Sequence, residues 1–266
     1  MAVVTLPMYD PPALHWATDA LYGALRDALR ARGIAAPPLT RATDHAAAWG
    51  RPDLLLSQTC GWPYVTALRG RVRLVATPVY AAEGCEGPYY RSAVVVRAED
   101  PAGDLAACRG RRLAVNAFDS QSGFHALRAA VARLGAGALG PFFGGLVETG
   151  GHTASATAVA EGRADVAALD CVSWALLART APAIAARLKV AGWTPAAPGL
   201  PLITAADDVT LAALREAVRA VFAAPETAEA RAALLIVGAE PLDDAAYDRV
   251  VALGAEADAA GCAALA

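Results

Sequence analysis

The sequence predicts an α/β protein made of two αβ lobes with mostly parallel sheets, joined by a two-strand hinge, with a ligand cleft between the lobes. Short apolar runs alternate with stretches of helical periodicity along most of the 266 residues, and this alternation is typical of parallel sheets. Polar or Pro-rich breaks follow two of the runs, near residues 94–96 and 191–193, where we expect the chain to cross between lobes. The predicted first lobe is discontinuous, residues 1–93 plus 193–266, and the second lobe is residues 97–190.

The composition excludes several classes of protein. Hydrophobic residues make up 56% of the chain, charged residues 18%, and the net charge is -3, which argues against disorder and against a nucleic-acid-binding surface. No apolar run approaches the ~20 residues that a membrane-spanning helix needs. Residues 2–6 look like a first strand and not like a leader, so we expect a cytoplasmic protein from the sequence as it stands, or a periplasmic one if a leader lies upstream or was removed.

The elements of the predicted first lobe follow from apolar spacing. A strand at residues 2–6 precedes a helix that stops at Gly33, and buried-strand runs follow at residues 54–57 and 71–79. Polar loops follow each of these strands. Alanine-rich helical segments complete the lobe, near residues 207–222, 227–236 and 243–260.

The predicted second lobe repeats a strand, a turn and a helix. The crossover strands, 92–96 and 188–193, are continuous apolar runs that enter and leave it. Inside the lobe we expect three strands, at residues 113–115, 144–149 and 164–169. In such a sheet, ligands bind beyond the carboxyl ends of the strands, and the polar residues of this lobe lie at those ends.

Residues 116–125 join a short apolar strand directly to a helix and have the features of an anion-binding turn. Ser120 and Ser122 stand where the first backbone N–H groups of the helix have no intrahelical partner, with Gln121 and Gly123 in the same turn. A helix N-terminus carries about half a positive charge and points its donors outward, so a phosphate, phosphonate, sulfonate or carboxylate would fit there. The alternative is that the two serines only cap the helix.

Two further polar residues follow strands of this lobe. His152 comes after a Gly-Gly turn, where it either caps its helix or binds an anion. Asp170 ends the strand at 164–169, and its carboxylate would repel a bare oxyanion. We therefore expect Asp170 either to pair with a basic group of the protein or to hold an amine on the ligand.

Taken together, these motifs resemble the phosphate/phosphite/phosphonate-type substrate-binding proteins of ABC transporters, which have the type II periplasmic-binding fold. The resemblance implies that Ser120, Ser122 and His152 bind the oxyanion of the ligand. Gln121 stands where the family suggests a small hydroxylated residue, which puts the preferred head group in doubt. The resemblance covers most of the chain and is based on residues 119–123, 151–155, 158–170 and 90–92.

The other lobe offers its own candidates for ligand binding. Tyr9, Gln58, Thr59 and Tyr90 lie on loops after predicted strands and could supply hydrogen-bond donors and an aromatic wall. Each of them is equally compatible with ordinary packing.

Two classes of function fit these observations. The first is a binding module that closes on a small oxyanion-bearing ligand for an ABC transporter, acting as a monomer, with no catalytic residues, cofactor or metal. The second is a cytosolic enzyme on the same fold, similar to menaquinone-pathway lyases or a pyrimidine-precursor synthase, with His152 or Asp170 as a general base and Cys60 as nucleophile. We favour the first, because the sequence shows no set of nucleophile, base and orienting residue.

The five cysteines contain no CxxC motif and match neither a zinc site nor a dense disulfide scaffold. Cys60 and Cys85 follow neighbouring predicted strands, so in a parallel lobe both would emerge at the same end of the sheet. We expect the two to come close, and to be bridged only if the protein is exported. The alternative is two unrelated buried thiols.

Overall fold

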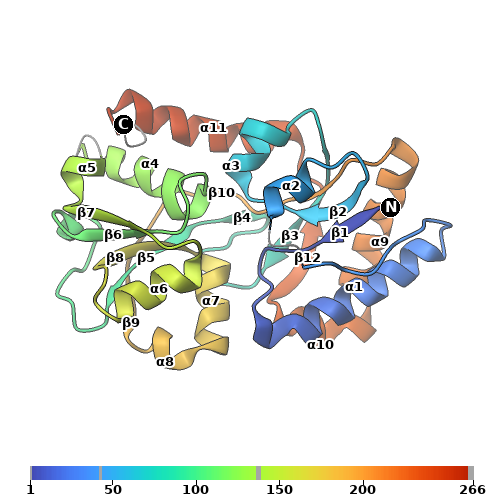
Figure 1. Ribbon diagram of the computed structural model, residues 1–266, viewed down its shortest axis with the longest axis horizontal. Helices are drawn as coiled ribbons and strands as arrows, with labels where there is room; N and C mark the ends of the chain where they lie inside the picture. Colours follow the sequence, from blue (N-terminus) through green and yellow to red (C-terminus); the bar gives the residue numbers. More distant parts are fainter. Residues whose placement is uncertain (1, 42–43, 136–138, 263–266) are drawn as a thin grey trace. The chain divides into compact units, whose positions relative to one another are not determined.

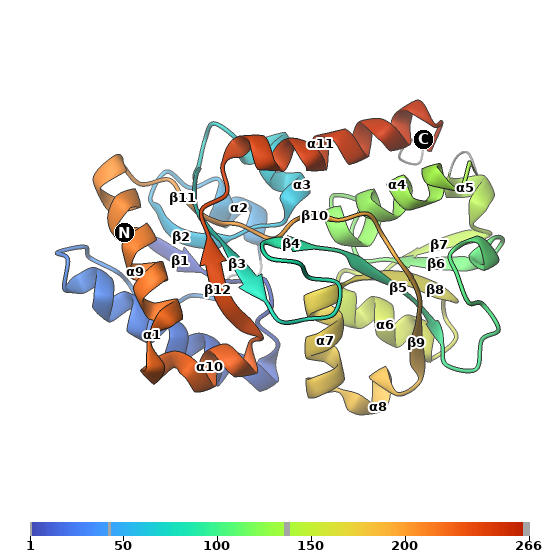
Figure 2. The ribbon, with the colours of Figure 1, turned by 180° about the vertical axis from the view of Figure 1, so that it is seen from behind.

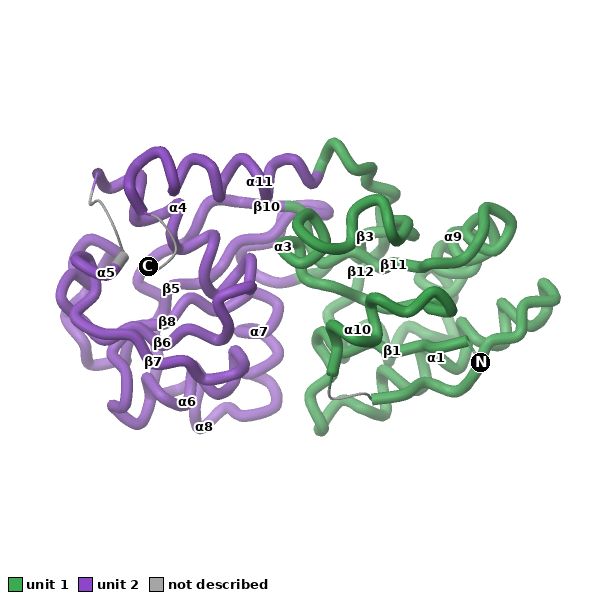
Figure 3. Tube along the Cα trace, turned by 45° about the horizontal axis from the view of Figure 1, so that its top comes forward, with its two compact units in different colours: residues 1–81, 198–246 green, residues 82–197, 247–266 purple. Residues whose placement is uncertain are grey.

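The computed structural model describes residues 2–41, 44–135 and 139–262, and they form two compact units (Figure 3). Unit 1 comprises residues 1–81 and 198–246, and unit 2 comprises residues 82–197 and 247–266. Each unit is an α/β layer structure with its own sheet. Among the described residues, no helix has the length and apolar character to span a bilayer.

Unit 1 is built on a five-stranded mixed sheet in the order β1-β2-β11-β3-β12. Strands β1 and β2 are parallel, whereas β11 is antiparallel to β2 and to β3, and β12 is antiparallel to β3. Strand β2, the second strand in this order, is buried along its whole length, as its continuous apolar run predicts. The strands are β1 (Val3–Thr5), β2 (Leu54–Gln58), β3 (Arg73–Tyr80), β11 (Leu202–Thr204) and β12 (Ile236–Glu240).

The helices of unit 1 cover this sheet with amphipathic faces. Helix α1 buries the stripe that its leucine spacing predicts, and it packs against α9 and α10 (Figures 1 and 2). The helix ends at Arg30, and Gly33 follows with a φ of 78°, a left-handed conformation that glycine adopts without strain. The helical elements are η1 (Pro12–Leu14), α1 (His15–Arg30), α2 (His45–Trp49), α3 (Gly61–Pro63), η2 (Tyr64–Leu68), α9 (Asp208–Ala223), η5 (Pro225–Thr227) and α10 (Ala228–Ala233).

Unit 2 is built on a second five-stranded mixed sheet in the order β7-β6-β8-β5-β9. Strand β6 is parallel to β7 and β8, whereas β5 is antiparallel to β8 and β9. The register places Ser92 opposite Asp170. The strands are β5 (Ser92–Arg97), β6 (Arg112–Val115), β7 (Gly145–Glu148), β8 (Val166–Asp170) and β9 (Leu188–Trp193), and a separate two-stranded sheet joins β4 (Tyr89–Tyr90) to β10 (Ala197–Pro198).

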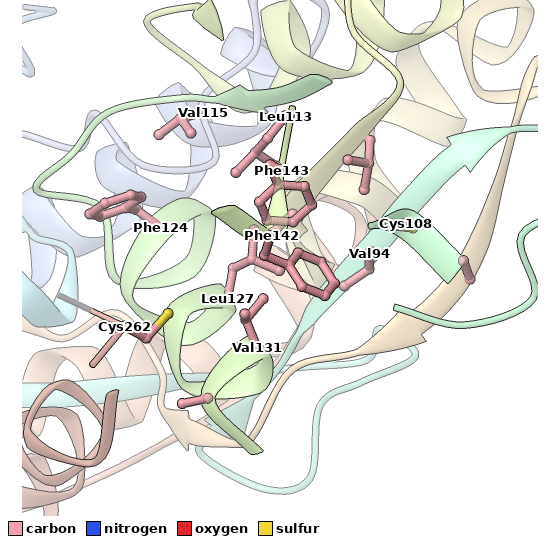
Figure 4. Close-up of a cluster of buried hydrophobic side chains, with 14 of the residues drawn as sticks. Val94, Cys108, Leu113, Val115, Phe124, Leu127, Val131, Phe142, Phe143 and Cys262 are labelled. Carbon is pink, nitrogen blue, oxygen red and sulfur yellow. The ribbon is translucent and has the colours of Figure 1, made fainter. Parts of the chain in front are cut away.

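The first face of this sheet packs against η4 (Gln121–His125) and α4 (Ala126–Arg133) through large side chains (Figure 4). Side chains alternate between the two faces of each strand, so every second residue of β5, β6 and β8 contributes to this cluster. Helix α5 (Leu139–Phe142) adds aromatic rings at its end. The cluster includes Val94, Val96, Leu113, Val115, Phe124, Leu127, Val131, Phe142, Phe143 and Val166.

The second face carries a thinner layer that is rich in alanine. It packs against α6 (His152–Ala160), which lies on the side of the sheet opposite to α4 (Figures 1 and 2). Three other helical elements complete the unit: η3 (Ala106–Cys108), α7 (Cys171–Thr180) and α8 (Pro182–Ala185). The layer includes Ala93, Val95, Ala114, Ala156, Ala158, Val159, Ala160, Ala167 and Leu169.

The last helix, α11 (Asp244–Ala259), begins in unit 1 and continues into unit 2. In unit 1, Tyr64 hydrogen-bonds the Asp244 carboxylate through its hydroxyl. In unit 2, the buried guanidinium of Arg128 pairs with Asp258 and donates to the Cys262 carbonyl (2.8 Å). Both ends of the helix are therefore fixed by polar contacts within their own unit.

The two-lobed α/β fold class is confirmed, and three details differ from the prediction. The sheets are mixed and not mostly parallel, because β5, β11 and β12 run against their neighbours. The units divide at 81/82 and 197/198, since β5 and β9 pair inside the second sheet, and residues 247–262 belong to unit 2, where we expected the first lobe. Residues 236–240 form a strand that we did not predict; the predicted helix ended at residue 236. The hinge stays a prediction.

Candidate anion-binding site

The candidate site of unit 2 lies at one edge of its sheet. The parallel strands β6, β7 and β8 end at this edge, and each is followed by residues that the sequence singled out. Ser120 to Gly123 follow β6, His152 follows β7, and Asp170 is the last residue of β8. The topology therefore gathers residues that are up to 50 positions apart in the sequence, as the parallel arrangement of these three strands predicts.

Ser120 is the N-cap of the helical segment that continues into α4. Its side-chain Oγ accepts a hydrogen bond from the Gly123 backbone N–H (3.0 Å) and another from Nδ2 of Asn116 (3.0 Å). A hydroxyl oxygen has two lone pairs, so these two donors occupy its accepting capacity. The Ser120 O–H is left as a donor, which is the role an anion requires.

Gly123 is needed because the Asn116 side chain lies directly against its backbone. A Cβ atom at this position would stand 1.7 Å from Oδ1 of Asn116. The Gly residue of the motif thus allows Asn116 to reach Ser120. We did not assign this role to Asn116 from the sequence, although its position directly after β6 was a signal.

Ser122 connects the two helices that flank the sheet edge. Its Oγ lies 3.0 Å from Nε2 of His152, the first residue of α6, and 3.5 Å from Oγ of Ser120. The Ser122 backbone is fixed by a hydrogen bond from Oγ of Ser92 to its carbonyl (2.8 Å). The N-termini of η4 and α6 therefore meet at one hydroxyl, and both contribute positive electrostatic potential there.

His152 is neutral at pH 7 in this structure. Burial lowers the pKa of His152 to about 4, although the Ala168 carbonyl close to the ring favours the protonated form. A neutral imidazole has one donor and one acceptor nitrogen. It can therefore adjust its tautomer so that Ser122 either donates or accepts.

Asp170 has a structural role that the sequence did not reveal. Its Oδ1 accepts from the backbone N–H groups of Val172 (2.8 Å) and Ser173 (3.0 Å), so the carboxylate caps α7. The register of β5 and β8 places it opposite Ser92, the residue that supports Ser122. Asp170 thus lies at the predicted edge of the sheet, where its carboxylate caps α7.

The remaining predicted residues of unit 2 are Gln121 and Tyr90. Gln121 is fully buried, and Tyr90 is 4% exposed, so both side chains belong to the interior of the described structure. Their assignment as ligand-binding residues stays a prediction.

In unit 1, Tyr9 and Gln58 meet at a third side chain, Tyr80. The Tyr9 and Tyr80 rings are edge-to-face at 5.0 Å, and Nε2 of Gln58 donates to the Tyr80 hydroxyl (3.2 Å) and to the Leu200 carbonyl (3.0 Å). Tyr9 also has a φ of 59°, a strained value for a residue with a side chain.

Thr59 is the last predicted residue of unit 1. Its backbone N–H donates to Pro201 (3.1 Å), and its hydroxyl donates to the Cys60 carbonyl (3.3 Å). The donors of Gln58 and Thr59 therefore serve the fold. Tyr80, which the sequence did not single out, is the residue that organises this group.

The chemistry available at the edge of unit 2 is hydrogen-bond donation to an anion. Ser122 and His152 have the separation of a nucleophile and a base, but the His152 ring lies near the Ala168 carbonyl. Among the described residues, no carboxylate is hydrogen-bonded to the ring to orient it as a base. The described residues also contain no cluster of side chains suited to a metal ion. The geometry is that of a two-lobed solute-binding protein.

A family comparison supports this class. The profile of the family described as "ABC transporter, phosphonate, periplasmic substrate-binding protein" matches residues 3–247. The chain belongs to this family. The family is one of substrate-binding proteins, so the enzyme alternative is not supported. Comparison with curated protein sequences finds no match.

Solved structures share the fold over nearly the whole chain. A binding protein component of an ABC phosphonate transporter from Pseudomonas aeruginosa has a TM-score of 0.78 at 20% identity, covering 100% of this chain and 90% of that one. PhnD1 from Prochlorococcus marinus, in complex with methylphosphonate, has a TM-score of 0.76 at 13% identity, with coverages of 97% and 98%. A Xanthomonas citri protein bound to chloride ion has a TM-score of 0.74 at 19% identity, with coverages of 97% and 98%.

Proposed function

We propose that unit 2 binds the oxyanion group of a phosphonate-like ligand through Ser120, Ser122, the first amides of η4 and His152. The observation that carries this proposal is the 3.0 Å contact between Ser122 Oγ and His152 Nε2, which joins two helix N-termini at one point. The first N–H groups of a helix have no partner within the helix, so the N-termini of both helices can supply donors to an anion at that point. An oxyanion bound there would accept hydrogen bonds from several donors whose positions the fold fixes.

The hydrogen-bond directions suit an anion. Ser120 already accepts two hydrogen bonds and can only donate its own proton. If Nε2 of His152 carries the ring proton, it donates to Ser122, and the Ser122 hydroxyl is then oriented to donate as well. In that tautomer the site offers two hydroxyl donors, and their described hydrogen-bond partners carry no positive charge, which favours a ligand whose charge is spread over several oxygens.

We further propose that the ligand does not need an amine. A carboxylate that caps a helix is already hydrogen-bonded, and Asp170 is in this position. Phosphate and simple alkylphosphonates are then the preferred class, ahead of aminoalkylphosphonates. Ligand contacts by Tyr9, Gln58, Thr59, Tyr90 and Gln121 stay proposals, and the same titrations on single alanine variants of these residues would test them.

The cellular role that fits the family is delivery of this ligand to the permease of an ABC transporter. We propose that the protein acts there as a monomer, outside the cytoplasm, as the periplasmic description of the family suggests. Co-purification with the permease and the mass of the protein in solution test these two points.

The experiment is calorimetric titration with methylphosphonate, phosphate, 2-aminoethylphosphonate, methanesulfonate and acetate. Ser122→Ala should weaken binding of the preferred ligand at least about tenfold, because a hydrogen bond to a charged group contributes roughly 1.5 to 3 kcal/mol. Thr157→Ala is the matched control, since it also removes a hydroxyl from unit 2, but this hydroxyl lies on α6 and donates to the Thr153 carbonyl of its own helix (2.8 Å). Equal affinity in wild type and a normally folded Ser122→Ala variant would place the anion elsewhere.

A further inference from the structure

Two cysteines of unit 2 lie in contact at the start of α7. The Sγ atoms of Cys85 and Cys171 are 3.4 Å apart, and both residues are free thiols. Sequence analysis paired Cys85 with Cys60, but the loop that carries Cys85 leads into β4 and β5 of unit 2. Because Ser92 pairs with Asp170 across the sheet, the chain just before β5 runs beside the chain just after β8, where Cys171 lies.

The backbone holds the two sulfurs in this position. Gly84, next to Cys85, has a φ of 96°, and a Cβ atom there would stand 3.0 Å from Cβ of Cys171 and 2.6 Å from the Trp193 ring. The loop is therefore packed tightly against α7, which only glycine allows. Backbone hydrogen bonds fix each cysteine as well, from Cys85 to Ala82 (3.0 Å) and from Cys171 to Arg91 (3.1 Å).

The two thiols are chemically unequal. Cys85 is half-buried, whereas Cys171 is fully buried. The neighbouring Cys171 thiol, which can donate to a thiolate, lowers the pKa of Cys85 against the effect of burial. The Cys85 sulfur and burial together raise the pKa of Cys171. Cys85 is thus the more accessible and more readily ionised of the two, as an attacking thiol needs to be.

We propose that Cys85 and Cys171 form a disulfide when the protein meets a disulfide-bearing oxidant. The Cys85 thiolate attacks one sulfur of the oxidant, forms a mixed disulfide and releases the other sulfur as a thiolate. Cys171 then loses its proton and attacks Sγ of Cys85, which forms the internal bond and releases the second thiolate. Two protein thiols lose two electrons and two protons, and the oxidant is reduced to two thiols.

The bond would attach the loop before β4 to the first residue of α7. That residue follows Asp170, whose carboxylate caps the same helix. A disulfide between residues 86 positions apart closes a long loop of the unfolded chain, which is the case in which cross-linking stabilises most. An oxidising compartment outside the cytoplasm would supply the oxidant for this reaction. Disulfide formation can be tested without any ligand.

The test treats the reduced, folded full-length chain with oxidised glutathione, alkylates the remaining thiols after denaturation, and maps the peptides by mass spectrometry. We expect a Cys85–Cys171 linked peptide, with Cys60, Cys108 and Cys262 alkylated, and a melting temperature about 5 to 10 °C above that of the reduced protein. Cys60→Ser is the matched control and should behave as wild type. Cys85→Ser should lose both the link and the temperature shift.

Gly84→Ala supplies an independent variant, because a methyl group there should push the loop away from Cys171 and slow the bridging at least several-fold. Full alkylation of Cys85 and Cys171 after oxidant treatment, or a Cys60–Cys85 peptide in their place, would overturn the proposal. Cys85→Ser alters a half-buried side chain and should fold, so a folding failure of Cys171→Ser would not obscure the result.

Discussion

The role of Gly123 can be tested by adding a single methyl group. In Gly123→Ala the new Cβ would stand 1.7 Å from Oδ1, 2.6 Å from Cγ and 3.3 Å from Nδ2 of Asn116. Two of these separations are far below van der Waals contact, so the Asn116 side chain has to rotate away or the turn has to shift. Either movement breaks the hydrogen bond from Asn116 to Ser120.

The cost follows from these two effects. Loss of the Asn116–Ser120 hydrogen bond removes about 1 kcal/mol, and overpacking of a buried turn adds about 1 to 3 kcal/mol. We therefore expect Gly123→Ala to lower the free energy of unfolding by about 2 to 4 kcal/mol. Because the same turn presents Ser120 and Ser122, anion affinity should fall as well.

A double-mutant cycle isolates the clash. Asn116→Ala removes the atoms that the new methyl group would meet, so the double variant should be less destabilised than the sum of the single variants, with a coupling energy of about 1 to 3 kcal/mol. Urea denaturation followed by circular dichroism measures each free energy of unfolding. Gly103→Ala is the control, since a Cβ there meets no heavy atom within 4 Å. Additive effects of Gly123→Ala and Asn116→Ala would refute the steric explanation.

Two other predictions concern charge. The pKa of His125 is lowered to about 3, chiefly by burial and further by Arg128, and that of His152 to about 4 by burial, so the unfolded chain binds more protons than the folded one below pH 6.5. The free energy of unfolding should therefore fall as the pH decreases from 6.5 toward 4, by about 1 kcal/mol per pH unit for each histidine. Urea denaturation of His152→Gln should show a weaker dependence on pH. An identical slope in the variant and the wild type would contradict the lowered pKa of His152. Asp258→Asn leaves the buried Arg128 guanidinium without its carboxylate and should cost about 1 to 3 kcal/mol in thermal denaturation. The same change at the exposed Asp119 should cost little, and equal effects would show that the pair contributes nothing.

Much of unit 2 could be predicted because its strands are short, continuous and β-branched or apolar. The prediction of a strand at 188–193 matches β9, and that at 113–115 matches β6 to within one residue. The strand β12 was missed because residues 227–236 are alanine-rich and favour a helix by propensity. Leu235 ends that helix with a φ of 62°, and such a backbone change has no signal in a run of apolar residues.

The site was predictable where a strand end determines the chemistry. Ser120, Ser122 and His152 come together because parallel strands bring their carboxyl ends to one edge. The support that Ser92 and Asn116 give them depends on tertiary contacts, which a sequence pattern does not contain. The role of Asp170 could not be predicted from the sequence, since a carboxylate before a helix is as typical of a cap as of a ligand contact.

The unequal layers on the two faces of the unit 2 sheet give the helix that carries His152 and the helical segment that carries Ser122 different mechanical properties. Helix α6, with His152, rests on alanine, whose side chain has no rotamers and leaves no room for adjustment. The segment that carries Ser122 rests on phenylalanine and leucine, which can repack with small rearrangements. If the proposed site binds oxyanions of different size, we expect His152 to stay in place and the turn that carries Ser122 to adjust.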